Sequence, residues 1–422
     1  MKYNFLQELE WRGLIKNITP FTESNFESID TFSGYVGFDP TAPSLHVGNL
    51  CAIMLLKHLQ LSGRKPIVLL GGFTGRIGDP AGKVNERKIL PEEIILHNIN
   101  CLRNQFSKFL DFSCGKNSAE IVDNIGWLSN LSLADFLNEV GRYFSVNYMM
   151  AKDSVKSRLE NGLSFNEFVY QLFQAYDFYW LYNNKNCKLQ MGGSDQWGNI
   201  TGGVELLRRK DNIESFALTT PLLLKSDGGK FGKSEEGNIW LDANLTGPYK
   251  FYQFWLNVDD VQIGSLLRIF TLLSKGEIEQ LEHENVNNPN KLKRVLAKYL
   301  TTVVHSDDIS NQVEKASNLL FGHSSLTDYE TIDETILHDI FHGLPTFVFK
   351  KDEYKTSNID YIVHKIFGIT KGESRRLING NGISINTVKV SDYKQNTAEF
   401  ILIKEKYLII KKGKTHGVAK FI

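Results

Sequence analysis

Short apolar runs bounded by glycine alternate with helix-like segments in the first half of the chain, and this alternation constrains the fold more than any other feature. The helix-like segments, such as 49–62 and 199–210, have apolar residues three and four apart. Strands that alternate with helices predict a doubly wound parallel sheet, with its ligand site at the carboxyl ends of the strands. The predicted strands are 34–39, 66–72, 120–123, 188–192 and 217–224.

The pattern changes further along the 422-residue chain, which is longer than one hydrophobic core usually organises. From about 129 to 182 it is mostly helical and rich in aromatic residues, which predicts an insertion between two halves of the sheet. The expected domains are a sheet domain over 1–247 with a glycine-rich loop at 225–237, a helical domain over 248–320, a linker over 321–345 and a small α+β unit over 346–422.

Composition places the chain among globular proteins, because hydrophobic residues make up 42% and charged residues 23% of it. No run approaches the roughly 20 apolar residues of a transmembrane helix, so we expect a soluble protein without a membrane partner. The N-terminus resembles an amphipathic helix and lacks the apolar block of a signal peptide, which favours the cytoplasm. The four cysteines have no paired spacing, so we expect neither a metal site nor a disulfide framework.

Charge is unevenly distributed, although 48 basic and 48 acidic residues balance over the whole chain. From Thr346 to Ile422 there are 15 Lys and Arg against 7 Asp and Glu, a net charge of +8. A basic unit attached to an acidic body is typical of proteins that bind polyanions, but a solvated basic face has the same composition. On charge alone, both interpretations remain open.

The segment YVGFDPTAPSLHVGN, residues 35–49, carries the first chemical signal. A predicted strand ends at Asp39, and a helix begins near His46, where backbone N–H groups and the helix dipole favour phosphate. His46 and Asn49 are three residues apart and so share one face of that helix start, and Gly48 would let a nucleotide approach the backbone. Such a tetrad also occurs by chance, and a structural histidine is the alternative.

The second signal is the glycine-rich loop KSDGGKFGKSEEG, which holds Lys230 and Lys233. Two lysines three residues apart on a flexible loop can close on a triphosphate and stabilise the charge on departing pyrophosphate, whereas a solvated loop is the alternative. A P-loop is the rival interpretation of Gly232-Lys233-Ser234, but the glycine it requires falls at Asp227. The other Gly-Lys steps fail the same test, so we expect phosphate to be bound in another manner.

In this order on an alternating α/β chain, the two motifs resemble the HIGH and KMSKS signatures of class I aminoacyl-tRNA synthetases, which have a Rossmann-type sheet. A third segment, QMGGSDQWGN at 190–199, resembles the signature of bacterial-type tyrosyl-tRNA synthetases, as do GDPAGK, FSVNYMMAKDSV and QAYDF. The resemblance extends over essentially the whole chain. It implies attachment of tyrosine to tRNA(Tyr) through tyrosyl-adenylate, with tyrosine, ATP with Mg²⁺ and tRNA(Tyr) as substrates and no protein-bound metal.

The resemblance implies that six side chains bind tyrosine. Three of them, Tyr170, Gln174 and Asp177, are spaced i, i+4 and i+7 and so share one helix face. A polar stripe among aromatic residues fits the lining of a specific site, and a row of surface hydrogen bonds is the alternative. The rival within the family is an enzyme that activates tryptophan, whose indole has no hydroxyl to bind. By the resemblance, Tyr35 and Asp177 contact the phenol, Asp79, Tyr170 and Gln174 receive the ammonium, and Gln196 meets the carboxylate.

The resemblance also implies that the catalytic residues bind ATP and the transition state rather than act as acids, bases or nucleophiles. Asn49 replaces the second histidine of HIGH, and Val36 and Ala52 stand where many relatives have Cys and Thr, so fewer ribose contacts are expected. His46 and the two loop lysines disfavour a non-catalytic RNA-binding or splicing protein on this scaffold. The residues expected at ATP are Gly37, Asp39, His46, Gly48, Asn49, Lys83, Arg87, Gly193, Asp195 at the ribose, Lys230, Lys233 and Ser234, with His46, Asn49, Lys83, Arg87, Lys230 and Lys233 as the catalytic set.

The C-terminal unit contains KGESRRLINGNGISIN at 371–386, a basic helix followed by a short strand, and it resembles the αL RNA-binding module. Such modules bind RNA through shape and phosphate contacts, whereas a basic solubilising tail is the alternative. The aromatic segment around 144–165 resembles the dimer-forming region of the family, which implies a homodimer. The residues expected to bind tRNA are Ser374, Arg375, Arg376, Lys411, Lys412 and Lys414.

Overall fold

The computed structural model describes residues 3–20, 26, 31–81, 90–159, 162–226, 228–234, 237–320, 331–413 and 415–422. The chain forms two compact units. The first comprises Met1–Asp242 and Asp259–Leu292, and the second comprises Ala243–Val258 and Lys293–Ile422. None of the helices in the described ranges combines the length and the apolar character that crossing a membrane requires.

The first unit is built on a six-stranded sheet with strands β1 (Asn17–Ile18), β2 (Ser33–Phe38), β3 (Lys65–Leu70), β4 (Glu120–Asp123), β5 (Cys187–Gly193) and β6 (Phe216–Thr220). Their order is β1-β6-β5-β2-β3-β4, with β1 antiparallel to β6 and the other neighbours parallel. From β2 the chain adds β3 and β4 on one side and then β5 and β6 on the other. This confirms the predicted doubly wound, Rossmann-type sheet, in which ligands bind where the strand order reverses.

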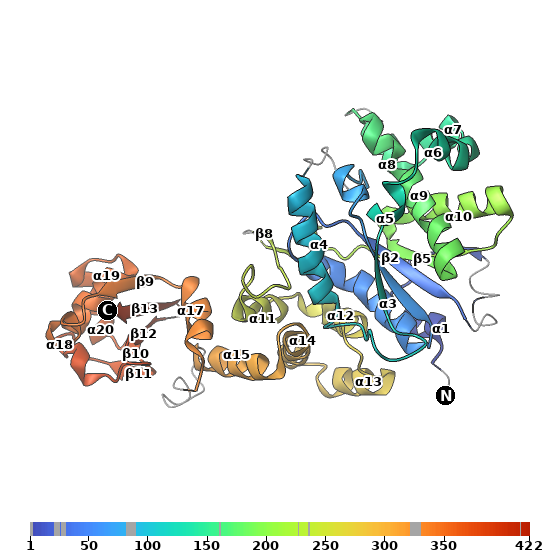
Figure 1. Cartoon of the computed structure of the whole chain (residues 1–422). Coiled ribbons are helices and arrows are strands. Elements are labelled where there is room, and N and C mark those ends of the chain that lie inside the picture. Colours follow the sequence, from blue (N-terminus) through green and yellow to red (C-terminus); the bar gives the residue numbers. More distant parts are fainter. Residues whose placement is uncertain are drawn as a thin grey trace. The chain divides into compact units, whose positions relative to one another are not determined.

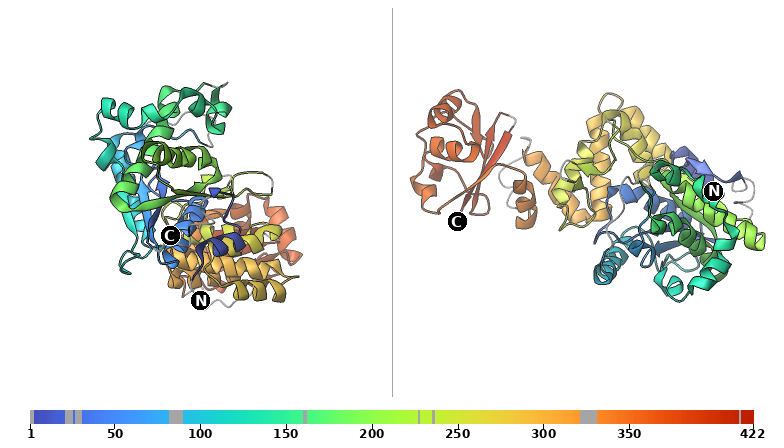
Figure 2. Two further views of the ribbon diagram at one scale, coloured as in Figure 1. Left: turned by 90° about the vertical axis from the view of Figure 1, so that its right-hand side faces the viewer. Right: turned by 90° about the horizontal axis from the view of Figure 1, so that it is seen from above.

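Helices cover both faces of the sheet in Figures 1 and 2, namely α3 (Leu50–Leu61), α4 (Glu92–Phe106), α9 (Phe165–Lys185) and α10 (Trp197–Asp211). A Cβ atom at Gly34 of β2 would lie 2.8 Å from Leu59 of α3. The next residue, Tyr35, points to the other face, where its ring packs on Phe178 of α9. Because both faces are covered, the central strands β2, β3, β5 and β6 are mostly buried.

The helical insertion lies between β4 and β5 and ends with α9. Serine side chains begin three of its helices by accepting a backbone N–H, at Ser132, Ser145 and Ser164. Arg158 and Glu167 form an ion pair with both side chains buried and a nitrogen–oxygen distance of 2.8 Å. The shorter helices of the insertion are α5 (Ile125–Leu128), α6 (Leu133–Glu139), α7 (Val146–Met150) and α8 (Asp153–Leu159).

Two helices from the segment 248–320, predicted as one helical domain, belong to the first unit instead: α12 (Ile263–Phe270) and α13 (Lys275–Glu284). Arg12, which follows α1 (Phe5–Trp11), donates hydrogen bonds of 2.6–2.8 Å to three carbonyl oxygens in and just after α12. The Arg12 side chain is buried, and these carbonyls offset the cost of burying its charge. Such contacts join positions far apart in the sequence, so the local pattern does not show this division.

The helical part of the second unit contains α11 (Pro248–Leu256), most of α14 (Pro289–Val304), α15 (Asp307–Leu320) and α17 (Glu334–His342). α17 falls within the predicted linker 321–345, of which 321–330 lies outside the described residues. Its apolar residues recur at helical spacing and bury one face, which an irregular polar linker would not do. The buried residues of α17 are Ile336, Leu337, Ile340 and Phe341.

The C-terminal part of the second unit is an α+β module, with strands β9 (Thr346–Phe349), β10 (Ile383–Ile385), β11 (Val388–Val390), β12 (Tyr407–Lys412) and β13 (Thr415–Phe421). They form a mixed sheet in the order β11-β10-β12-β13-β9. Its helices are α18 (Glu353–Thr356), α19 (Ile359–Phe367) and α20 (Lys371–Asn379). Apolar residues of α19, α20 and one face of the sheet share a single buried core, so this module is folded and not a tail.

Candidate active site

The carboxyl ends of β2 and β5 carry several of the predicted site residues. Asp39 follows β2, and its carboxylate accepts hydrogen bonds from Thr74 Oγ1 at 2.9 Å and from Tyr170 Oη at 3.0 Å. At the end of β5, a Cβ atom on Gly193 would lie 2.7 Å from the Asp195 carboxylate. Glycine at position 193 therefore leaves room for Asp195 beside the strand end.

His46 and Asn49 hold each other at the start of α3, just before and within η2 (Val47–Asn49). The His46 backbone N–H donates to Asn49 Oδ1 at 2.9 Å, and the His46 side chain accepts from the Asn49 backbone N–H. The His46 ring also meets the Trp240 ring edge-on, with centroids 5.9 Å apart. Both motif side chains are half-buried, and Gly48 between them is exposed.

The loop that holds Lys230 and Lys233 lies directly against this helix start. Gly232 has a φ of 80°, which favours glycine, and a Cβ atom there would lie 3.1 Å from the backbone nitrogen of Gly48. Phe231 is buried and stacks on an aromatic ring of α12, with centroids 6.2 Å apart. Lys230 and Lys233, on either side of this anchor, are exposed. The two predicted motifs are therefore neighbours in space.

Tyr35 and Asp177 place two buried polar groups on the α9 side of β2. Asp177 is 2% exposed and accepts hydrogen bonds from Asn124 Nδ2 at 3.0 Å and Trp127 Nε1 at 2.8 Å. Burial raises the pKa of Asp177 to about 7, while these two donors favour its charged form. The Tyr35 hydroxyl is buried too, and it has no hydrogen-bond partner in the part of the chain that the structure describes. Burial and the nearby charge of Asp177 raise the pKa of Tyr35 well above its ordinary value.

Asp79 is the centre of another buried group and is 6% exposed. Its carboxylate accepts hydrogen bonds from Gln196 Nε2 at 2.5 Å and from Asn199 Nδ2 at 3.2 Å. Gln196 comes from the turn after β5, so this bond ties the predicted carboxylate-binding residue to a predicted ammonium-binding residue. Gln174, one turn after Tyr170 on α9, is half-buried.

Hydrogen bonds run continuously from Tyr170 to Asp177. Tyr170 and Thr74 both donate to Asp39, and Asn124 Nδ2 lies 3.0 Å from both Thr74 Oγ1 and Asp177 Oδ2. Sequence motifs do not identify Thr74 and Asn124. Asn124 directly follows β4 and Thr74 lies shortly after β3, so both belong to the carboxyl edge of the sheet, and this is the signal that could have found them.

Some predicted residues provide no distances for describing the site. Lys83, Arg87 and Lys414 lie outside the described residues. Ser234 ends the short strand β7 (Lys233–Ser234), which pairs with β8 (Gly237–Asn238), and Gly37 is exposed in β2. Within the described ranges, no three His, Cys, Asp or Glu side chains gather in a way that could hold a metal ion.

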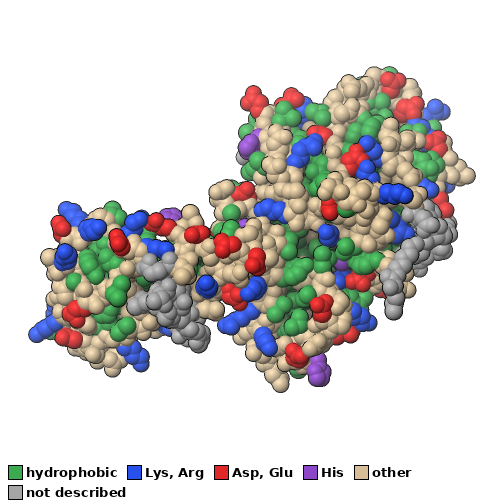
Figure 3. All heavy atoms as spheres, turned by 60° about the horizontal axis from the view of Figure 1, so that its bottom comes forward, with side chains coloured by type: hydrophobic (Ala, Val, Ile, Leu, Met, Phe, Trp, Pro, Cys, Tyr) green, Lys and Arg blue, Asp and Glu red, His purple; other side chains and the backbone are tan. Residues whose placement is uncertain are grey.

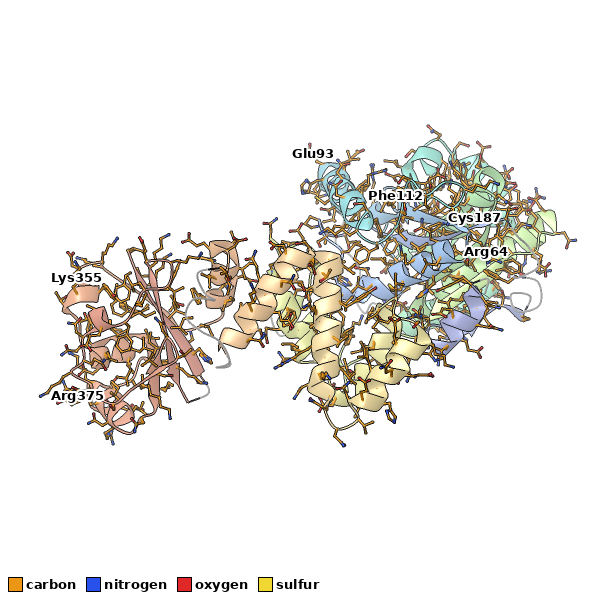
Figure 4. The ribbon with its side chains drawn as sticks, turned by 90° about the horizontal axis from the view of Figure 1, so that it is seen from below. Arg64, Glu93, Phe112, Cys187, Lys355 and Arg375 are labelled. Atoms are coloured by element: carbon orange, nitrogen blue, oxygen red, sulfur yellow. The ribbon has the colours of Figure 1, made fainter. Side chains whose placement is uncertain are left out.

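The predicted RNA-binding residues of α20 differ in their exposure to solvent. Arg376 is exposed. Ser374 is fully buried, so the prediction that its side chain contacts tRNA is corrected: this position of the helix faces the core. Arg375, labelled in Figure 4, is half exposed, and its Nε donates to buried Asp360 at 2.7 Å. Its guanidinium also lies 5.0 Å from the Tyr393 ring centroid.

Basic side chains continue onto the sheet of the module. Lys411 and Lys412 end β12 and are half-buried. As neighbours on a strand they point to opposite faces, and Lys412 Nζ lies 4.8 Å from the Phe367 ring centroid on the helix side. Figure 3 shows Lys and Arg side chains spread over this module with Asp and Glu between them. On the face that Figure 3 draws, acidic side chains therefore lie between the basic ones.

Comparisons with known proteins decide the family. The model of class I tRNA synthetases (W and Y) matches residues 29–322, and that of the tyrosine–tRNA ligase SYY-like C-terminal domain matches residues 337–417. The tyrosine–tRNA ligase of Amoebophilus asiaticus is 50% identical over 98% of both chains, and that of Bacteroides thetaiotaomicron is 49% identical over 97% of this chain and 98% of its own. This chain belongs to the class I tyrosyl-tRNA synthetases.

The solved structures agree with this synthetase family. A C-terminally truncated mitochondrial tyrosyl-tRNA synthetase from Aspergillus nidulans has a TM-score of 0.67 at 29% identity, covering 75% of this chain and 94% of that one. Tyrosyl-tRNA synthetases attach tyrosine to tRNA in two steps, of which the first, formation of the adenylate, consumes ATP. The tryptophan enzymes share the first family model, whereas the two full-length bacterial relatives are tyrosine enzymes.

Proposed function

We propose that this chain activates tyrosine with ATP, releases pyrophosphate, and transfers the tyrosyl group to the 3′-terminal adenosine of tRNA(Tyr). The buried Tyr35 hydroxyl, which has no partner among the described residues, carries the proposal. Leaving such a group unpaired costs about 1–3 kcal/mol. A substrate phenol beside Tyr35 and Asp177 would accept from the former and donate to the latter, whose oxygens have lone pairs to spare.

This arrangement supports selection of tyrosine over phenylalanine and tryptophan. Phenylalanine would leave the Tyr35 hydroxyl and the Asp177 carboxylate without their partner, in surroundings that water does not reach. Tryptophan brings a larger ring with no hydroxyl. Within the proposal, Asp79, Tyr170 and Gln174 receive the ammonium group of tyrosine, and Gln196 meets its carboxylate.

For the chemical step, we propose in-line attack of the tyrosine carboxylate on the α-phosphate of ATP, which binds together with Mg²⁺. Positioning and charge stabilisation carry such a step, so no side chain has to act as acid, base or nucleophile, and no protein-bound metal is included. The contact between Gly232 and Gly48 supports this, because it keeps the loop lysines beside the His46 motif. The proposed ATP site consists of Gly37, Asp39, His46, Gly48, Asn49, Gly193 and Asp195, with Lys83, Arg87, Lys230, Lys233 and Ser234 around the pyrophosphate.

For tRNA, we propose binding by the C-terminal module through Arg376, Lys411, Lys412 and Lys414, with Arg375 mainly holding the module together. We also propose a homodimer, in the cytoplasm, that pairs through the helical insertion. Exposed apolar side chains are candidates for such an interface. In the insertion, the exposed apolar side chains are Leu133, Leu137, Val146 and Phe165, at 54–76% exposure.

The test is pyrophosphate exchange into ATP with tyrosine, phenylalanine and tryptophan measured side by side. We expect exchange with tyrosine, very little with phenylalanine, and none with tryptophan. Asp177→Ala should reduce tyrosine exchange sharply while the variant stays folded. Equal exchange with tyrosine and phenylalanine would contradict the proposed site, and exchange with tryptophan alone would contradict the proposed substrate.

A further inference from the structure

Trp127 and Trp180 lie face to face beside Asp177. Their ring centroids are 4.1 Å apart, and the ring planes differ by 10°. Trp127 belongs to α5, a single helical turn after β4, and is buried, whereas Trp180 is half-buried on α9. Asp177 and Trp180 are three residues apart on α9, so they lie on neighbouring positions of one helix face.

The stack fixes the direction of a hydrogen bond. An indole N–H points in the plane of its ring, so the Trp127 Nε1 bond to Asp177 of 2.8 Å depends on how that ring is tilted. The other donor, Asn124, is held by polar contacts of its own: its Oδ1 accepts from the Phe73 backbone N–H at 2.8 Å, and its Nδ2 lies 3.0 Å from Thr74 Oγ1. The indole of Trp127 has a single polar group, the N–H that it donates to Asp177. The ring therefore has no second hydrogen-bonding group to fix its orientation, so packing has to do so.

We propose that Trp180 is a positioning residue for the tyrosine hydroxyl: its ring holds the Trp127 indole in the plane that aims Nε1–H at Asp177. This rests on the proposed function, in which Asp177 accepts that hydroxyl. Asp177, which accepts the bond, and Trp180, whose ring orients the donor, both lie on α9, so they move as one rigid element. Trp180 acts through Trp127 and does not itself touch the substrate.

The expected effect is on substrate discrimination. When the ring at 180 is lost, the indole can tilt, and Asp177 keeps one well-aligned donor in place of two. A poorly fixed carboxylate binds the tyrosine hydroxyl less well, while phenylalanine, which has no hydroxyl, is affected little. We expect the ratio of kcat/KM for tyrosine to that for phenylalanine to fall about tenfold in Trp180→Leu, the size expected for weakening a hydrogen bond to a charged group.

The experiment is a double-mutant cycle on full-length protein, with pyrophosphate exchange for both amino acids as the readout. Its variants are Trp180→Leu, Trp127→Phe, which removes the N–H and keeps a ring, and the double variant. We expect each single variant to reduce discrimination and the double variant to be no worse than Trp127→Phe. Independent losses that multiply in the double variant would overturn the proposal, because they show that Trp180 does not act through Trp127.

Three further variants distinguish a failure of this inference from a failure of the proposed function. Trp180→Phe keeps a stacking ring and should restore most of the discrimination, including in the event that Trp180→Leu does not fold. Tyr179→Leu removes a half-buried ring of the same helix that contacts Tyr176 and Lys210, and it should leave discrimination unchanged. Asp177→Asn should lose it. If Asp177→Asn has no effect, the proposed function fails at this residue; if only the Trp180 variants have none, the inference on Trp180 alone is wrong.

Discussion

The carboxylate of Asp339 accepts a hydrogen bond of 2.7 Å from the backbone N–H of Tyr249, ninety positions earlier in the chain. Asp339 belongs to α17 and Tyr249 to the first turn of α11, so α17 caps the N-terminus of α11, where negative charge is favourable. A Cβ atom at Gly247 would lie 1.9 Å from the Asp339 carboxylate, so a larger residue at 247 would displace it. α17 is therefore part of the helical structure of the second unit and not a passive linker.

This cap determines where a truncation should be made. Deletion after Leu344 keeps α17 and removes the basic module, so pyrophosphate exchange should stay close to that of the full chain. Aminoacylation of tRNA should fall severely, because the removed phosphate contacts supply affinity that the acidic remainder lacks. Exchange and aminoacylation are measured on the same preparation across salt concentrations.

A matched deletion after Leu320 removes Asp339 as well, and the resulting protein should melt at a lower temperature. If aminoacylation survives the deletion after Leu344, the module is not the main anchor for tRNA. If that same deletion abolishes exchange, activation depends on the C-terminal residues after all.

Arg375 and Arg376 should separate structure from RNA binding. Arg376 is exposed, and Arg376→Ala should weaken tRNA binding and reduce the slope of its salt dependence by about 1, with an unchanged melting temperature. Arg375→Ala leaves buried Asp360 without its guanidinium, so it should lower the melting temperature of the module. Filter binding across salt and calorimetry check the two variants. Equal effects of both on melting would contradict this division.

Local spacing was enough to predict part of the site. His46 and Asn49 are three residues apart at a helix start, and the structure shows them bonded to each other there. Strand and helix positions followed from apolar periodicity, because burial on both faces of a parallel sheet leaves a continuous apolar run. Such features depend on neighbours within one turn or one strand.

The groups that the sequence did not reveal depend on distant contacts. Asn124 and Trp127 meet Asp177 across about fifty residues of chain, and no spacing rule connects them. The buried state of Ser374 depends on how α20 packs on its sheet. Asp339 lies in a stretch that the sequence predicts as a linker, whereas the structure places its carboxylate at the start of α11.

The exposed loop lysines should act on the rate of activation. Lys230→Ala and Lys233→Ala should each lower the rate of adenylate formation about tenfold or more, because they stabilise charge that develops on pyrophosphate. Tyrosine affinity should change little, since tyrosine is bound by other residues. Lys225→Ala, in the same loop, is the control and should have a small effect. Rapid-quench measurement of adenylate distinguishes the outcomes, and parallel losses in tyrosine affinity would show that the loop has another role.

The exposed apolar residues of the insertion should mediate dimerisation. Phe165 is 76% exposed, and Phe165→Glu places a charge on the surface that we propose to be buried between two copies. We expect the wild-type chain to sediment as a dimer and the variant as a monomer at the same concentration. Val286→Glu alters an equally exposed apolar residue outside the insertion, at 74% exposure, and should remain a dimer. A wild-type chain that is active as a monomer would contradict the prediction.

Asp177 should make both activity and stability depend on pH. Burial raises its pKa to about 7, from 3.8 in the unfolded chain, so the folded protein binds this proton more tightly than the unfolded chain does. This contribution favours the folded state at low pH and is lost as pH rises from about 4 to about 7, with no further change above that. Activity should follow the opposite course, because the charged carboxylate is the better acceptor for the tyrosine hydroxyl, so kcat/KM for tyrosine should rise to a plateau above about pH 7.

The control is Asp177→Asn, which keeps the shape of the side chain and cannot ionise. Urea unfolding of both proteins between pH 5 and pH 8 should show a decline in the free energy of unfolding for the wild type that exceeds the decline for the variant. Asp39 and Asp123 are the nearby carboxylates whose charge also raises the pKa of Asp177, and Tyr35 is the nearby phenol. These groups are present in both proteins, so the difference between the two profiles isolates residue 177. Superimposable profiles would mean that Asp177 keeps an ordinary pKa, and the rise in activity would then have to come from another group.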